Sequence, residues 1–183
     1  AVAQSTYGRA LAANGQPERA IGLLEAGMRV WQAHGIVWTM LGGTSTVHFS
    51  LAQAHAWLGG FDIAHMHADR ATAEFIQMGW PAFEASRLGA MAALASGSID
   101  GFVSNAVRHF SLPIPITLSR GPTHPVSTGF TIDAARCVLM TARAALAAWH
   151  GALPAQIWPA TLMLIAREYL ALGQNPVAFR LYG

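Results

Sequence analysis

The stretch that decides the fold is YGRALAANGQPERAIGLLEAG at residues 7–27, where one helix-forming run leads to a glycine and a second run follows. The same arrangement returns at residues 51–71 as LAQAHAWLGGFDIAHMHADRA, displaced by 44 positions throughout. A third copy, IAREYLALGQNPVAFRLY, occupies residues 165–182, and a weaker one, GAMAALASGSIDGFVSNA, occupies residues 89–106. Self-similarity at this spacing indicates a tandem array of helical pairs.

Fixed spacings within each copy explain how a pair closes. The glycine ends the first helix, because it adopts the left-handed backbone of a helix C-terminus at no steric cost. Pro17, Glu18 and Asp62 follow the turn, where the first turn of a helix tolerates proline and is stabilised by an acidic residue. Five residues after the turn glycine comes an alanine that we expect to be buried where the two helices meet, namely Ala20, Ala64 and Ala178.

This pattern resembles the tetratricopeptide repeat (TPR), in particular the long-period units found in sensor or scaffold regions of large bacterial signalling proteins. The resemblance covers residues 3–79 and 160–183 clearly and residues 84–110 more weakly. It implies an all-α fold, an α-solenoid of antiparallel helix pairs whose first helices line a concave groove. Turn glycines 38 and 44 positions apart exceed the usual unit of about 34 residues, so longer helices or loops must absorb the difference.

Four prolines between residues 113 and 125 divide the chain. They lie within residues 111–130, for which the sequence predicts an extended linker or a long surface loop, readily cut by proteases, rather than a helix. We therefore expect TPR-like helical repeats at 1–110, the proline-rich loop at 111–130, and further helix pairs at 131–183 with the last repeat truncated. Within the third part, apolar residues recur on one face of residues 131–149 and predict a helix.

Composition favours a folded helical protein and argues against several partners. Charged residues make up 11% of the 183 residues and hydrophobic residues 53%, so the signature of disorder is absent. The net charge is +2 and no basic run occurs, which argues against DNA or RNA. The uncharged stretch between Arg143 and Arg167 is long enough to cross a membrane, but Pro154 and Pro159 break it into two pieces. The lone Cys137 excludes an internal disulfide, and we expect a buried thiol.

The first residues lack the basic and apolar regions of a signal peptide. We therefore interpret the chain as an excerpt of a larger cytoplasmic protein.

Histidines in the first half are the candidates for metal chemistry. His48, His55, His65 and His67, with Asp69, are ligand types that zinc accepts. On a helix, however, His65 and His67 point about 200° apart, which leaves at most two convergent ligands. The spacing favours packed or solvent-facing histidines over a metal site, and no cofactor is expected.

No catalytic motif supports an enzyme. Ser119, Arg120 and His124 in the loop could be drawn as nucleophile, anion binder and base, but the sequence has no nucleophile elbow, phosphate loop or Cys–His signature. Gly43 before residues 44–46 predicts a helix cap rather than a phosphate cradle. Most tryptophans are expected in the core or at seams between units rather than at a ligand; the six are Trp31, Trp38, Trp57, Trp80, Trp149 and Trp158.

The favoured function is a protein- or peptide-binding scaffold, because solenoids work through the surface of their first helices. One alternative is a small-molecule sensor or enzyme domain that uses the His- and Trp-rich first half, with residues 111–130 as a lid. Another is a cap of a longer array with no role of its own. If the resemblance holds, the groove carries arginines that imply an acidic or C-terminal-carboxylate peptide, or another domain of the same chain. The groove-facing residues are then Arg9, Phe49, Gln53, Arg87, Met91, Met163 and Arg167.

Overall fold

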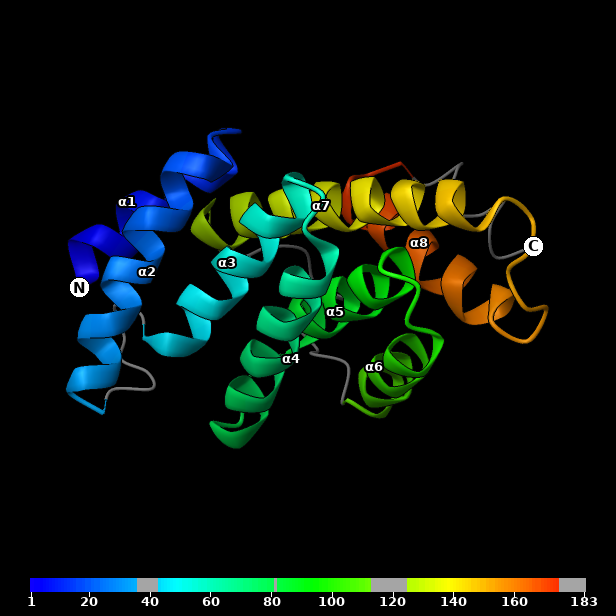
Figure 1. Cartoon of the computed structure of the whole chain (residues 1–183), viewed down its shortest axis with the longest axis horizontal. Helices are drawn as coiled ribbons and strands as arrows, with labels where there is room; N and C mark the ends of the chain where they lie inside the picture. The colour runs from blue at the N-terminus through cyan, green and yellow to red at the C-terminus, as the bar shows by residue number, and fades with distance from the viewer. Residues whose placement is uncertain (36–42, 81, 113–124, 175–183) are drawn as a thin grey trace.

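The computed structural model describes residues 1–35, 43–80, 82–112 and 125–174 (Figure 1). These residues form eight helices and no strand. Six helices make three antiparallel pairs: α1 (Val2–Ala13) with α2 (Pro17–Ala33), α3 (Thr44–Trp57) with α4 (Phe61–Gln77), and α5 (Phe83–Ala95) with α6 (Ile99–Ser111). Two further helices follow, α7 (Pro125–Trp149) and α8 (Trp158–Ala171).

The same turn closes the first helix of every pair. After α1, Gly15 has a φ of 71°, and the next N–H donates to the Leu11 carbonyl at 2.9 Å. After α3, Gly59 has a φ of 79°, and the next N–H donates to the His55 carbonyl at 2.9 Å. A bond of this kind across a left-handed glycine is the Schellman cap, which satisfies a terminal carbonyl and turns the chain back. The repeat predicted from the sequence is therefore a repeat of this cap, which occurs again at Gly97 and Gly173.

At the start of α3 a side-chain hydroxyl bonds to the backbone of the N-cap residue, Gly43. The N–H of Gly43 donates to Thr46 Oγ1 at 3.2 Å, and that hydroxyl donates to the Gly43 carbonyl at 3.1 Å. The sequence predicts an N-cap at Thr44, Ser45 or Thr46; the N-cap residue is instead Gly43, and Thr46 lies three residues further on, within the first turn.

Small residues allow the helices of a pair to approach closely. Ala20 and Ala64 are fully buried, as predicted, while Ala178 lies outside the described residues. On α1, a Cβ atom added to Gly8 would lie 2.9 Å from the Leu24 side chain, so the position accepts glycine alone without rearrangement. Successive pairs pack in chain order, α2 against α3 and α4 against α5. The described part of the chain is thus an all-α, TPR-like solenoid of antiparallel helix pairs.

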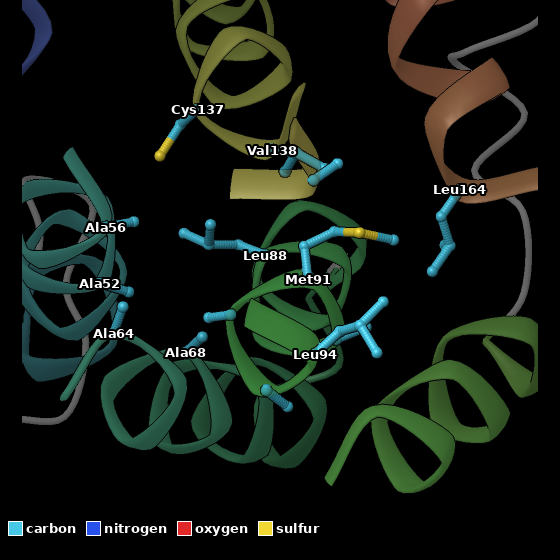
Figure 2. Packing of buried hydrophobic residues seen from close by; sticks show 14 of the residues in the cluster. Ala52, Ala56, Ala64, Ala68, Leu88, Met91, Leu94, Cys137, Val138 and Leu164 are labelled. Atoms are coloured by element: carbon cyan, nitrogen blue, oxygen red, sulfur yellow. The ribbon is translucent and has the colours of Figure 1, made fainter. Parts of the chain in front are cut away.

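Helix α7 departs from this regular stack. It lies across the first helices α3 and α5 and also packs on α8 (Figure 1). One hydrophobic core runs from α3 to α8 and contains Val138 of α7 together with Leu88 and Met91 of α5 (Figure 2). A second cluster joins α1, α2 and α3. Helices from the predicted parts 1–110 and 131–183 therefore share one core.

The boundaries of α7 correct the prediction for the proline-rich loop. Residues 125–130 are helical, and so is Ser111 at the end of α6, where the sequence predicts extended chain. A proline disfavours helix in the residue before it, but as the first residue of a helix it leaves the following residues free to continue. The helix predicted over 131–149 is confirmed and begins earlier, at Pro125. The rest of the loop, 113–124, lies outside the described residues.

The uncharged stretch between Arg143 and Arg167 is divided between two helices, as predicted. Helix α7 ends at Trp149 and α8 begins at Trp158, with positive φ at His150 (39°) and Gly151 (77°) between them. Across the described ranges, none of the helices combines the length and the apolarity that a membrane crossing requires.

Candidate partner-binding surfaces

The groove that the sequence predicts along the first helices is filled by the chain itself. Phe49 of α3 is 1% exposed and Met91 of α5 is 0% exposed, and both belong to the core that includes α7. Arg87 of α5 is 6% exposed. The prediction that these three residues face an open groove is therefore wrong, because an apolar stripe on a first helix can pack against the same chain as well as against a partner.

The side of α7 that packs on the first helices consists largely of small side chains. Ala134, Ala142 and Val138 are buried there. The Cys137 thiol lies 3.8 Å from the carbonyl oxygen of Gln53, another predicted groove residue, which is half-buried on α3. Cys137 is fully buried, as predicted, and burial raises its pKa to about 12. Its side chain therefore acts as a packing group, in line with the inertness of buried thiols.

A buried ion pair joins α5 to α8. Arg87 Nε lies 2.7 Å from Glu168 Oε1, and Arg87 Nη2 lies 3.7 Å from Glu84 Oε1. Burial raises the pKa of Glu168 to about 7, although the charge of Arg87 acts to lower it. Sequence reasoning identified Arg87 as a surface residue and missed Glu168. The available signal was that Glu168 is the one acidic residue of α8, whose sequence is mostly apolar.

Arg167, the preceding residue of α8, reaches α6. Its Nη1 donates to His109 Nε2 at 2.6 Å, and its guanidinium carbon lies 5.7 Å from the centre of the Phe110 ring. Because Nε2 accepts, the proton of His109 is on Nδ1 and is directed at Ser86 Oγ, 2.9 Å away. Burial, followed by the charges of two nearby arginines, lowers the pKa of His109 to about 3. His109 is therefore a neutral partner for Arg167.

The predicted arginines do not share one surface. Arg9 lies on α1, at the end of the stack far from α8 (Figure 1), and its pKa is lowered by burial. Arg87 is buried between α5 and α8, whereas Arg167 is half-buried at the contact of α8 with α6. Met163, one turn before Arg167, is exposed. The structure thus brings Met163 and Arg167 together and separates them from Arg9.

A cavity of about 690 Å³ lies where α2, α3 and α4 meet. Its lining includes Gln32 of α2, Thr44 and His48 of α3, and His67 and Glu74 of α4. The Thr44 hydroxyl donates to Glu74 Oε2 at 2.8 Å, which holds the carboxylate in a buried position. The cavity combines acidic, basic and aromatic side chains.

Three histidines gather beside this cavity. His48 Nδ1 and His67 Nδ1 are 2.8 Å apart, so one ring donates and the other accepts. His55 stacks on His67 with 5.8 Å between ring centres. Burial, followed by the charges of neighbouring groups, lowers the pKa of both His48 and His67 to about 4. Among the residues that the structure describes, no three His, Cys, Asp or Glu side chains converge as metal ligands.

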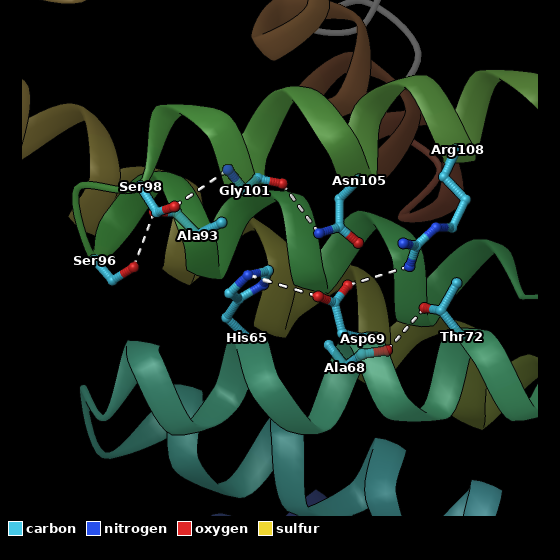
Figure 3. Close-up of polar contacts among 10 residues, drawn as sticks. All are labelled: His65, Ala68, Asp69, Thr72, Ala93, Ser96, Ser98, Gly101, Asn105 and Arg108. Atoms are coloured by element: carbon cyan, nitrogen blue, oxygen red, sulfur yellow. Dashed lines mark hydrogen bonds and ion pairs between the residues drawn. The ribbon is translucent and has the colours of Figure 1, made fainter.

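His65 diverges from His67, as the two-residue spacing predicts. Its Nε2 lies 3.7 Å from Asp69 Oδ2, and Arg108 Nη1 donates to Asp69 Oδ1 at 3.3 Å (Figure 3). The contact with Arg108 links the second helices α4 and α6, so Asp69 has a structural role.

The tryptophans divide between core and surface. Trp31 is buried and donates to Ser5 Oγ at 3.0 Å, and Trp149 and Trp158 pack against the core. Trp57 and Trp80 are exposed, so the expectation of a core or seam position fails for them. Among the candidate site residues and tryptophans, those outside the described residues are Trp38, Ser119, Arg120 and His124.

In comparisons with known proteins, the similarities found are to solved structures. A crystal structure of a Podosopora anserina putative kinesin light chain with nearly identical TPR-like repeats is similar, with a TM-score of 0.48 and 19% identity; the alignment covers 98% of this chain and 90% of that one. A second structure of the same description has a TM-score of 0.47 and 20% identity, with the same coverage of both chains. No protein-family model matches the sequence, and neither does any curated protein.

Proposed function

We propose that the chain is a helical-repeat scaffold that binds a protein or peptide partner. The observation that supports this function is that the surface formed by the first helices of two pairs, α3 and α5, binds another helix of the chain. We call this surface the first-helix face. Helix α7 lies along α3 and α5, and Phe49 and Met91 are buried in the core that it completes. A helix seated on two neighbouring helices is one of the general modes by which proteins hold helical segments of partners.

A partner from outside meets a different surface, because α7 already covers the central first helices. Large apolar side chains are exposed on α4, α6 and α8. Single exposed apolar residues are normal, but a cluster on one face marks an interaction surface. On α6 such residues lie four and three positions apart and share one face: Val103, Val107 and Phe110.

The partner that we propose is an acidic segment of another protein or of another part of the same protein. Arg167 supports this, since a guanidinium binds carboxylates in a fixed two-pronged geometry. The resemblance to repeats of bacterial signalling proteins supports a place within a larger cytoplasmic signalling protein.

A peptide array tests this function. The whole chain is offered acidic and neutral helical peptides, each beside a scrambled peptide of the same composition, and binding is followed by fluorescence anisotropy at low and high salt. We expect saturable binding of acidic helical peptides that weakens as salt rises. No binding by any peptide, or equal binding of the scrambled ones, would contradict a scaffold.

A small-molecule sensor is the second candidate, and the cavity beside His48 and His67 supports it. A ligand that binds the folded chain alone raises its melting temperature. A thermal-shift screen with metals and metabolites should then find a ligand that stabilises the chain by several degrees. Ala73→Trp, a change of an exposed cavity residue, should abolish that shift and leave the unliganded melting temperature unaltered.

A further inference from the structure

An apolar surface with one arginine at its centre lies where α6 and α8 meet. Val107 is 62% exposed and Phe110 is 40% exposed on one face of α6. On α8, Met163 and Leu170 are also exposed, four positions before Arg167 and three positions after it. The contact of Arg167 with Phe110 brings the two sets together. We call these five residues the Arg167 patch.

The guanidinium of Arg167 is held in place without being neutralised. The neutral His109 ring accepts one of its N–H groups, and the Phe110 ring lies against its face. Neither contact supplies a negative charge. Within residues 1–35, 43–80, 82–112 and 125–174, no carboxylate lies within ion-pair distance of Arg167. A positioned cation of this kind is ready for a carboxylate from outside.

Three other arginines differ from Arg167 either in having a carboxylate partner or in lacking exposed apolar neighbours. Arg87 lies 2.7 Å from the Glu168 carboxylate, and Arg108 lies 3.3 Å from that of Asp69. Arg143 on α7 is exposed, but the described large apolar side chains of α7 are not exposed beside it. Arg167 alone among these four combines exposed apolar neighbours with a guanidinium that no described carboxylate approaches to ion-pair distance.

We propose that the Arg167 patch binds a helical segment of another protein that carries a glutamate or aspartate in the middle of its apolar face. The inference rests on the proposed scaffold function and adds the site and the chemistry of the partner. Met163 and Leu170 are seven residues, or about 10 Å, apart along α8. Apolar residues three and four positions on either side of the partner's carboxylate span a similar length. They contact the apolar rim while the carboxylate meets Arg167.

The two kinds of contact have different effects. Burial of the apolar side chains on both sides supplies most of the affinity, because an exposed ion pair adds little by itself. The charge instead selects the partner, since a segment without the carboxylate leaves the guanidinium covered and unpaired. The patch should therefore distinguish a carboxylate from an amide of the same shape.

Two synthetic peptides test this distinction on the whole chain. Each is a capped helix of about 16 residues with leucines three and four positions on either side of a central residue, which is glutamate in one peptide and glutamine in the other. We expect the glutamate peptide to bind about fivefold more tightly, measured by fluorescence anisotropy. Arg167→Gln should remove this difference, whereas Arg143→Gln, a change of an exposed arginine outside the patch, should leave it intact.

A second variant tests the patch without changing Arg167, because Arg167 contacts the buried His109 and its replacement alters a contact within the fold. Val107→Ser removes an exposed apolar group, so it should weaken both peptides and leave the melting temperature unchanged. Ile63→Ser, a change of an exposed apolar residue of α4, is its control and should leave both affinities unaltered.

Several outcomes overturn the inference. Equal binding of the two peptides would show that Arg167 does not recognise the carboxylate. A preference for the glutamate peptide that persists in Arg167→Gln would show the same. Self-association of the chain that Val107→Ser abolishes, seen by sedimentation, identifies the patch as a contact with a second copy. If array peptides bind and Val107→Ser leaves their affinity unchanged, the scaffold function stands and this site fails. If no peptide binds, both fail.

Discussion

At Ala64 a single methyl group sets how closely α4 approaches its neighbours. The residue is fully buried, five positions after the turn glycine Gly59. Ala64→Leu should lower the free energy of unfolding by about 1–3 kcal/mol, because the added carbons have no space in a packed core. Urea denaturation measures the change. Ala73→Leu, on the exposed side of the same helix, should have almost no effect, and equal losses for the two would contradict the close packing at Ala64.

Arg87 and Glu168 show the cost of a buried charge. Both are buried and lie 2.7 Å apart, so removal of one leaves the other without its counter-charge. At pH 8, above the pKa of Glu168, Arg87→Met should lower the free energy of unfolding by about 3–5 kcal/mol. The double change Arg87→Met with Glu168→Leu should recover most of that loss, because no unpaired charge then remains. A double-mutant cycle by chemical denaturation checks this, and losses that simply add would show that the pair is not coupled.

Helix α7 is the element whose position decides whether the first-helix face is covered. Cys137, the single cysteine, is fully buried on its packed side. A thiol reagent should therefore modify Cys137 only when the chain unfolds, and the labelling rate in urea should follow the equilibrium of global unfolding. Fast labelling that is insensitive to urea would show that α7 leaves α3 and α5 by itself. Labelling of the fully unfolded chain gives the reference rate.

Short-range features of the helices were predictable from the sequence. The turn at Gly15 and its copy at Gly59 depend on residues within one helical turn, so their spacing is visible in the chain itself. The packing position of α7 was not predictable, because α3, α5 and α7 are rich in alanine and their faces differ little in hydrophobicity. Phe49 and Met91 could therefore be assigned to an open groove as readily as to a core.

The candidate site was predictable only in part for a similar reason. The burial of Arg87 depends on Glu168, which is 81 positions away, and no local pattern connects the two. Arg167 and Met163 lie four positions apart in the sequence, so their place on one face of α8 follows from helix geometry alone. Their contact with Phe110 of α6 depends on how the helices pack, which the repeat pattern alone does not determine.

Over the described part of the molecule, buried histidines and one buried carboxyl group make the stability depend on pH, and burial also lowers the pKa of His55. The pKa values of His48 and His67 are lowered to about 4 and that of His109 to about 3, with burial as the first cause. Glu168 has a pKa raised to about 7, also by burial. Between about pH 6.5 and pH 4 the unfolded chain protonates its histidines while the folded chain keeps these three neutral. Acid therefore favours unfolding through them.

Glu168 acts in the opposite direction. Between pH 7 and its unfolded value of 4.5, the folded chain holds a proton that the unfolded chain has lost, so acid favours the folded state through this group. Because several histidines act against one carboxyl group, we expect a net uptake of protons on unfolding between pH 6 and pH 5. The free energy of unfolding should therefore fall as the pH falls through that range.

Urea denaturation between pH 5 and pH 8 measures this slope. His109→Gln should reduce the proton uptake by about one, because the side chain at that position no longer titrates in either state. His34→Gln, at an exposed position, should leave the slope as it is. A stability that is level or rises from pH 6 to pH 5 would contradict the neutral state of the buried histidines in the folded chain, because uptake of protons by the unfolded chain alone must favour unfolding.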